Sequence, residues 1–237
     1  MKKTLLFIPL ILLLFIFHNS SVAQVSSLNI GWTYARMFSP LSNLEIPMYE
    51  FNLNNPNIEK KYDMPEYFRG IYTDWRIGSP KGGMIIGWAN KHAIAEAEGI
   101  AKEDTDSLYK VRNIKTRLNV LSWGGYFSLY RRIKMGITFD FGSFKVIKKV
   151  APKDEFKNAE WVALYDKKGT GTLGMTVNIS FPIKLSESLQ LRFQPYAQYV
   201  FIAAPLSVET TYYTNKYFYN PSSFGINTFL SFIWGNH

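Results

Sequence analysis

The chain contains no cysteine, only three histidines, and fewer acidic than basic residues. Without cysteine there is no disulfide framework, no thiolate metal site and no lipid attached through a cysteine. One long apolar run is present, from Leu5 to Phe17, and no later segment reaches the roughly 20 apolar residues that a membrane-spanning helix needs. If the remainder of the chain crosses a membrane, it must therefore cross as strands.

The single apolar run has the features of an export signal. Two lysines precede it, and Ser21-Val22-Ala23 places small residues before Gln24. A basic start, a short apolar centre and a small-residue cleavage site are typical of a secretory signal peptide. We therefore expect residues 1–23 to be a cleaved signal peptide and residues 24–237 to form one domain.

Apolar and polar residues alternate with a period of two along much of the chain, which is typical of strands. The clearest stretch runs from Thr172 to Phe181, and Ile133 to Gly142 and Leu189 to Gln198 follow the same rule. A bulge near Trp123-Gly124-Gly125 would explain a change of face in a less regular stretch. The pattern predicts eight strands at Ser26–Met37, Phe68–Gly78, Gly82–Asn90, Ile114–Ser128, Ile133–Ile147, Gly169–Ile183, Leu189–Ile202 and Phe224–Trp234.

The connections between these strands alternate in length. The odd-numbered connections contain 30, 23, 21 and 21 residues, whereas the even-numbered ones contain 3, 4 and 5. Outer-membrane barrels have an even number of strands, short turns at the periplasmic end and long loops outside. The expected fold is therefore all-β, an eight-stranded antiparallel up-and-down transmembrane β-barrel.

The alternating runs Thr172 to Phe181 and Leu189 to Gln198, the turn between them and the closing strand Phe224 to Trp234 carry a family resemblance. In these features the chain resembles small eight-stranded outer-membrane barrels of the OmpA or OmpX type. The resemblance implies an outer-membrane location in a Gram-negative envelope.

In a bilayer the apolar set must face lipid and the polar set must face the lumen. An eight-stranded barrel has room inside for side chains and little else, so the polar set would plug it; a narrow ion path is the alternative. The lumen set predicted to form an ionic network is Asp74, Arg76, Lys134, Asp140 and Arg192. Aromatic residues expected to form interfacial girdles are Trp75, Phe181 and Trp234 near the short turns and Tyr34, Trp88 and Phe201 near the long loops.

The net charge of +9 does not indicate nucleic-acid binding, because an exported protein does not meet a genome. It fits a phosphate-rich membrane surface, so the expected partners are membrane lipid and lipopolysaccharide, with an outer-membrane partner protein as a further candidate. Some barrels that resemble this one modify lipid A, and His92 is the only candidate base within the expected strands and loops. No neighbour in the sequence would orient it, so we expect no enzyme.

Motifs for cofactors and metals lack their required context. Gly169 to Gly174 has the glycine spacing of a dinucleotide site but opens a strand instead of a helix. Asp104 and Asp106 hint at calcium, yet the later glycine and glutamate of that motif are absent. The sequence therefore predicts no cofactor and no metal.

Function is expected in the four long loops, because a rigid barrel leaves its loops free to vary. Four prolines in the first loop, residues 38–67, indicate an ordered cap. Alternating alanines at 93, 95 and 97 either extend the third strand or start a helix. The alternatives are a barrel whose loops bind a ligand, surface or partner, an accessory subunit of a secretion or transport assembly of the PorT-like kind, a lipid A-modifying enzyme, and a secreted lipocalin-like barrel with reversed polarity.

Overall fold

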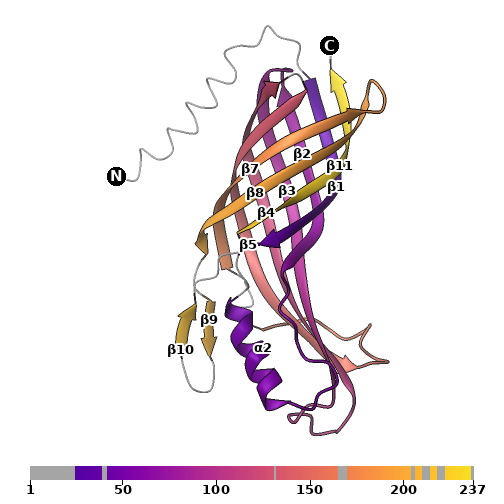
Figure 1. The fold of residues 1–237 in the computed structure, drawn as a ribbon, viewed down its shortest axis with the longest axis vertical. Helices are drawn as coiled ribbons and strands as arrows, with labels where there is room; N and C mark the ends of the chain where they lie inside the picture. Colours follow the sequence, from indigo (N-terminus) through magenta and orange to yellow (C-terminus); the bar gives the residue numbers. More distant parts are fainter. Residues whose placement is uncertain are drawn as a thin grey trace.

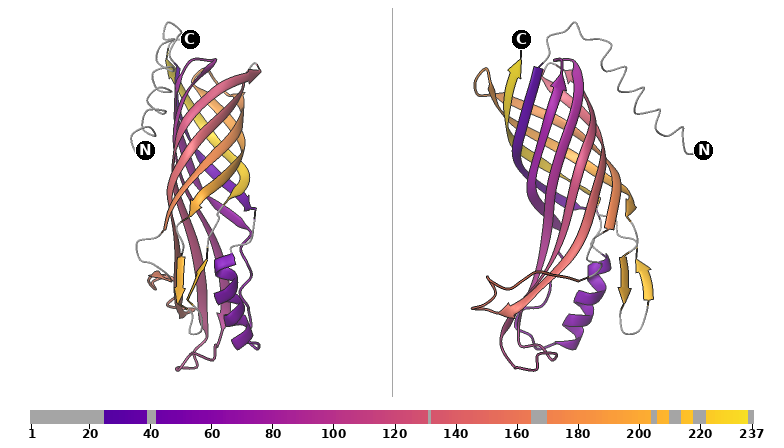
Figure 2. Two further views of the ribbon diagram at one scale, coloured as in Figure 1. Left: turned by 90° about the vertical axis from the view of Figure 1, so that its left-hand side faces the viewer. Right: turned by 180° about the vertical axis from the view of Figure 1, so that it is seen from behind.

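Eight long antiparallel strands close into a ring (Figures 1 and 2). The computed structural model describes residues 25–38, 42–130, 132–164, 170–203, 206–209, 214–217 and 222–235, so the expected signal peptide, residues 1–23, lies outside the described residues. Each strand pairs with its neighbour in the chain, and β1 pairs with β11 to close the ring. The strands are β1 (Val25–Met37), β2 (Tyr67–Gly78), β3 (Gly82–Gly99), β4 (Lys110–Tyr130), β5 (Ile133–Pro152), β7 (Thr170–Lys184), β8 (Leu189–Ala203) and β11 (Ser223–Gly235).

The faces of the strands follow the predicted alternation. On β5, Thr138 and Asp140 are buried inside the ring while Ile137, Phe139 and Phe141 are exposed on its outside. The other strands repeat this arrangement, with Asn29 and Thr33 buried on β1 and Trp32 70% exposed. An apolar exterior around a polar interior is the polarity of a barrel in lipid and the reverse of a lipocalin. The lipocalin-like alternative is therefore excluded.

Short and long connections lie at opposite ends of the ring. β1 begins and β11 ends at the short-turn end, and the long connections lie at the other end with α2 (Ser42–Asn54) and the β9–β10 hairpin (Figure 1). The hairpin pairs β9 (Leu206–Glu209) with β10 (Thr214–Tyr217), and β6 (Val162–Ala163) adds to the edge of β5. This arrangement confirms the predicted barrel topology.

Strands β3, β4 and β5 are longer than the sequence predicted. β3 was expected to end at Asn90 and runs to Gly99, and the pairing with β4 continues as far as Gly99 and Lys110. Ala93, Ala95 and Ala97 are buried on the inner face of this extension, where small side chains let α2 approach the sheet. The strand extension was one of the two predicted outcomes, and the second long loop is correspondingly short.

A helix in the first long loop was missed. Its apolar residues are spread around the helix and Pro47 lies within it, so no period of 3.6 stands out. Met48 is buried and Phe51 packs partly against the same core. No helix within the described ranges is long and apolar enough to cross a membrane.

The predicted bulge at Trp123-Gly124-Gly125 is wrong. β4 and β5 stay in register there, and the irregularity lies between Ser128 and Tyr130. Gly124 instead permits a close approach of two strands, because a Cβ at this position would lie 2.1 Å from the carbonyl oxygen of Ile137. The glycines mark tight strand packing, which a sequence pattern cannot distinguish from a bulge.

Candidate functional site

A buried ion pair lies in the lumen. Asp74 and Arg76 lie two residues apart on β2, so both side chains point inward. Nε and Nη2 of Arg76 donate to the two carboxylate oxygens of Asp74, each at 3.1 Å, and Asn29 on β1 also donates to this carboxylate. The carboxylate is thus held by two strands, and its charge compensates that of the guanidinium.

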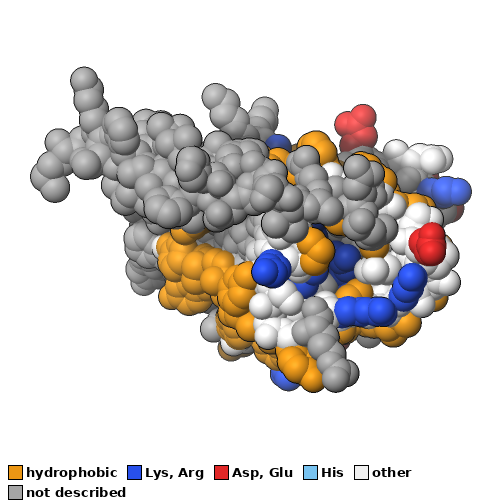
Figure 3. All heavy atoms as spheres, turned by 90° about the horizontal axis from the view of Figure 1, so that it is seen from above, with side chains coloured by type: hydrophobic (Ala, Val, Ile, Leu, Met, Phe, Trp, Pro, Cys, Tyr) orange, Lys and Arg blue, Asp and Glu red, His pale blue; other side chains and the backbone are white. Residues whose placement is uncertain are grey.

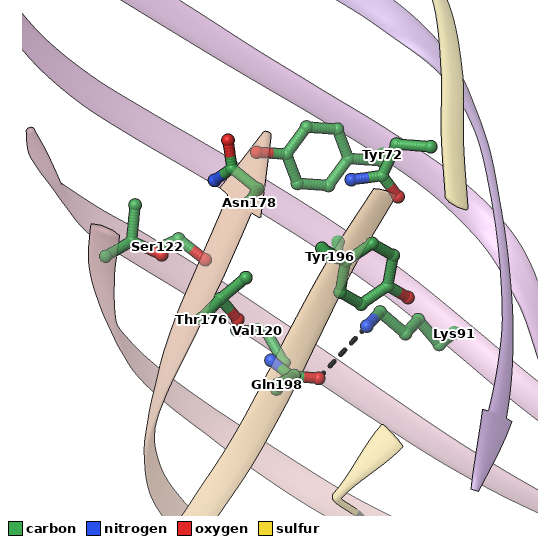
Figure 4. A pocket seen from close by; sticks show the side chains of 11 residues that line it. Tyr72, Lys91, Val120, Ser122, Thr176, Asn178, Tyr196 and Gln198 are labelled. Carbon is green, nitrogen blue, oxygen red and sulfur yellow. Dashed lines mark hydrogen bonds between the residues drawn. The ribbon is translucent and has the colours of Figure 1, made fainter. Parts of the chain in front are cut away.

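Asp140 on β5 is held without a direct ion pair. It accepts hydrogen bonds from the Thr138 hydroxyl at 3.1 Å, the Thr176 hydroxyl at 2.5 Å and the Gln198 amide at 2.6 Å. The amide oxygen of Gln198 in turn accepts from Nζ of Lys91 at 3.0 Å (Figure 4). Gln198 therefore links the buried cation Lys91 to the buried carboxylate of Asp140, and the opposite charges of these two residues balance.

The predicted ionic network thus divides into two parts. Asp74 and Arg76 form one part and Asp140 belongs to the other, while Lys134 and Arg192 form no salt bridge within the described chain. Arg192 donates through Nη2 to Gln190 at 3.4 Å, and Nζ of Lys134 lies 4.6 Å from the centre of the Tyr126 ring.

Sequence reasoning missed Lys91, because the third strand was ended at Asn90. Had the alternation been continued past that point, Lys91 would have been placed inward between Ala89 and Ala93. Gln198 was placed on the polar face, but its bridging role depends on the register between strands.

Large side chains fill the lumen around these groups. Phe229 stacks on Tyr72 with ring centres 5.8 Å apart, and the hydroxyls of Thr33 and Tyr196 lie 2.8 Å apart. The cavity shown in Figure 4 has a volume of about 20 Å³. That is room for about one water molecule, so this part of the lumen is packed.

The six predicted girdle residues all lie on the outside of the ring. Trp75, Phe181 and Trp234 lie near the short-turn end of their strands, and Tyr34 and Phe201 lie near the opposite end. Trp88 is also exposed, in the middle of the long strand β3. Tyr34 stacks on Tyr67 of the next strand, with ring centres 5.2 Å apart. We propose that these residues anchor the barrel at the two membrane interfaces.

Beyond the barrel wall lies a packed unit, which we call the outer module: α2, residues 55–66 and the ends of β3, β4 and β5. The Asn52 amide and the backbone of Tyr62 exchange two hydrogen bonds, at 2.9 and 3.0 Å. Lys60 pairs with Glu98 through the backbone, which extends the sheet along the free edge of β3. The long-loop end therefore carries an ordered surface, as the prolines predicted.

One carboxylate holds the tip of the outer module. Asp104 accepts from the Ala101 amide at 2.8 Å and from Lys110 at 3.2 Å, and it also pairs with Arg112. Burial alone would raise the pKa of Asp104, but the Ala101 amide and the two cations outweigh it, so the pKa lies below its ordinary value. This carboxylate is occupied by structural partners, and no group of three ligands within the described residues could hold a metal ion.

Charge on the outer surface changes sharply along β3, β4 and β5, where three successive rows of residues differ in type, and the last row continues onto β2. An apolar row is followed by a polar row and then, toward the outer module, by what we call the basic row. The apolar row contains Trp88, Leu121 and Phe141, the polar row Asn90, Asn119 and Ser143, and the basic row Arg69, His92, Arg117 and Lys145. Across the described ranges, the three permanent cations of this row form no salt bridge with an acid.

His92 lies in this row, beyond the apolar band. Burial, with added repulsion from Lys115, Arg69 and Arg117, lowers the pKa of His92. In the portion of the chain that the structure describes, no carboxylate or hydroxyl is hydrogen-bonded to its ring. The histidine therefore has cations around it instead of the orienting partner that a catalytic base uses.

No family model matches this chain, and neither does any curated protein. Among solved structures, it is similar to the outer-membrane protein OprG of Pseudomonas aeruginosa, with a TM-score of 0.50, 8% identity and coverage of 91% of this chain and 98% of that one. It is also similar to Ail, the attachment invasion locus protein of Yersinia pestis, solved with the heparin analogue sucrose octasulfate. The TM-score is 0.44 and the identity 10%, and the match covers 90% of this chain and 99% of Ail. For the outer-membrane protease OmpT of Escherichia coli the TM-score is 0.36 and the identity 10%, and the match covers 92% of this chain and 98% of OmpT.

At these identities the comparisons bear on the fold alone, and among these three structures the likeness to OprG reaches a level that supports it. The closed ring, the apolar exterior and the sorted loops lead independently to the same result. The chain is therefore a small eight-stranded outer-membrane β-barrel.

Proposed function

We propose that this chain is a non-enzymatic barrel that holds the outer module above the membrane as a binding surface. The supporting observation is the extension of β3, β4 and β5, which continue as paired strands beyond the apolar band and carry α2. Extra paired strands make a stiff support, and binding residues are commonly presented on such a frame.

The outer face of α2 is the best candidate contact surface. Tyr49 and Leu53 lie four residues apart, so they share one face of the helix, and each is 65% exposed. Exposed aromatic and aliphatic side chains grouped on one face are typical of protein interaction sites. An outer-membrane partner protein, as in an accessory subunit of a secretion or transport assembly, is accordingly the second candidate function.

Replacing both side chains, in a Tyr49→Ser/Leu53→Ser variant, is expected to remove a bound component. The measurement is purification from native membranes in mild detergent, followed by mass spectrometry of proteins and glycans at defined stoichiometry. Leu185→Ser is the matched control, because Leu185 is similarly exposed but lies in a short turn at the other end.

A component that is stoichiometric in the wild type and control but lost in the double variant supports the proposal. A barrel that purifies alone in all three forms argues against it. In the same cells, His92→Ala should leave the lipid A mass spectrum unchanged, and an altered spectrum would instead favour the lipid-modifying enzyme.

Lipopolysaccharide is the proposed lipid partner of the basic row. Arg69, Arg117 and Lys145 lie just past the apolar band, at the side where lipid phosphates would be found, and they are not neutralised by acids in the described part of the chain. Phosphate oxygens bind guanidinium and ammonium groups through charge-assisted hydrogen bonds.

An Arg117→Gln/Lys145→Gln variant should therefore bind lipopolysaccharide about ten-fold more weakly, which corresponds to about 1.4 kcal/mol. Binding is measured by titrating purified lipopolysaccharide into the protein in detergent. Lys81→Gln, in a short turn, serves as the control and should match the wild type. Equal affinity for all three proteins would rule out this role for the basic row.

A further inference from the structure

The short-turn half of the lumen holds more positive charge than its acids can balance. Arg76, Lys134 and Arg192 lie there with one carboxylate, Asp74, which is already paired with Arg76. Arg192 is close enough to both Arg76 and Lys134 for their charges to interact. Since a guanidinium stays charged under any condition the protein meets, Arg192 cannot relieve this excess by losing a proton.

The same region contains buried donors that bind nothing in the protein. Nη1 of Arg76, Nε and Nη1 of Arg192 and the hydroxyl of Ser180 have no hydrogen-bond partner among the described residues. Ser180 pairs in the register with Lys134, so its hydroxyl belongs to the same layer. Arg192 and Arg76 are 4% and 2% exposed, and charged donors buried to this extent are normally satisfied.

The other half of the lumen shows how this barrel balances charge where it can. There Gln198 joins Lys91 to Asp140, and that carboxylate has three donors. Nothing comparable joins Arg192 or Lys134 to an acid within the described ranges. Seen from the short-turn end, Lys and Arg side chains gather in the hollow of the ring (Figure 3). Lys134 is only partly buried. The cluster is therefore open to solvent at Lys134, while the two arginines are almost fully buried.

We propose that Arg76, Lys134, Arg192 and Ser180 form a binding site for a small oxyanion of the phosphate class at the periplasmic end of the lumen. The charged oxygens of a phosphate group accept hydrogen bonds and donate none. They therefore match a cluster of unpaired guanidinium, ammonium and hydroxyl donors. A doubly charged oxyanion would also compensate the two cations that no carboxylate balances. The site lies inside the barrel and is independent of the outer module.

Inorganic phosphate is the probe for the test. The full protein, purified in a maltoside detergent without phospholipid, is titrated calorimetrically, and its thermal midpoint is followed at constant ionic strength made up with sodium fluoride. We expect saturable binding of one phosphate per chain and a midpoint that rises with phosphate. Arg192→Gln should weaken binding by at least about ten-fold, as expected for loss of a charge-assisted contact.

Lys134→Gln provides a second variant if Arg192→Gln fails to fold, because Lys134 is less buried, and it should also weaken binding. Arg36→Gln, on the outer surface, is the control and should bind like the wild type. No saturable binding, or equal affinity in wild type and both lumen variants, would overturn the proposal and leave water as the partner of these donors.

A phosphate group can reach this site as a free ion or as part of a phospholipid headgroup. The second arm uses nanodiscs of phosphatidylglycerol or of phosphatidylcholine, prepared in a buffer without inorganic phosphate. If phosphatidylglycerol competes with added phosphate for the wild type but not for Lys134→Gln, the headgroup is the occupant. Undiminished phosphate binding in both nanodiscs would assign the free ion.

Discussion

Asp74→Asn is expected to destabilise the barrel by about 3 to 5 kcal/mol, because it leaves the buried Arg76 guanidinium without its counter-charge. Both side chains of this pair are almost fully buried, so solvent compensates the charge of Arg76 far less than the carboxylate does. The free energy of unfolding is measured by urea titration of the protein folded in lipid vesicles, with tryptophan fluorescence as the signal.

The pair Arg36–Glu66 provides the control, since its side chains are 54% and 55% exposed. Glu66→Gln should cost at most about 1 kcal/mol, as is usual for exposed ion pairs. Replacing both members of the buried pair, in Asp74→Asn/Arg76→Met, should recover most of the lost stability, because the unpaired charge is gone. A cost below about 1 kcal/mol for Asp74→Asn would show that Arg76 is solvated or neutralised in another way.

Phe139→Arg should destabilise the folded barrel by about 2 to 4 kcal/mol, the range for a basic side chain at the centre of the lipid-facing surface. Phe139 is exposed on the outer face of β5, next to Ile137 at the middle of the apolar stretch that runs from Ile133 to Phe141. The same vesicle unfolding assay measures the effect.

Val150→Arg is a control on the same strand. Val150 is also exposed, but it lies on the part of β5 that extends beyond the apolar band toward the outer module. A change within about 1 kcal/mol is expected there, because the cost falls toward the interface. Similar effects at the two positions would mean that the apolar band does not mark the depth of the bilayer.

The barrel could be predicted because each strand position has only two environments. From Thr172 to Phe181 every second residue is apolar, and a bilayer outside with a packed lumen inside leaves no other assignment of faces. The alternation of short and long connections then predicted a closed barrel, with the short turns at one end and the long loops at the other. Predicted and observed strand bounds agree most closely for β1, β2, β7, β8 and β11, which do not extend beyond the membrane band.

The outer module and the lumen contacts were harder to predict. The inner face of β3 beyond Lys91 carries alanines, because its partner there is α2 instead of the opposite barrel wall. The bridge through Gln198 requires that β3, β5 and β8 meet across the lumen, which depends on the register of the closed ring. Alternation predicts the face on which a residue lies but not the residue it meets.

The central claim is that the apolar face of every strand meets hydrocarbon and the polar face is turned inward. The most direct test is carbene photolabelling from a reagent carried on lipid acyl chains, with insertion sites mapped by mass spectrometry. The structure predicts labels on Ile137, Phe139 and Val177 and none on Thr138 or Thr176. Labels on the two threonines with none on their apolar neighbours would contradict it.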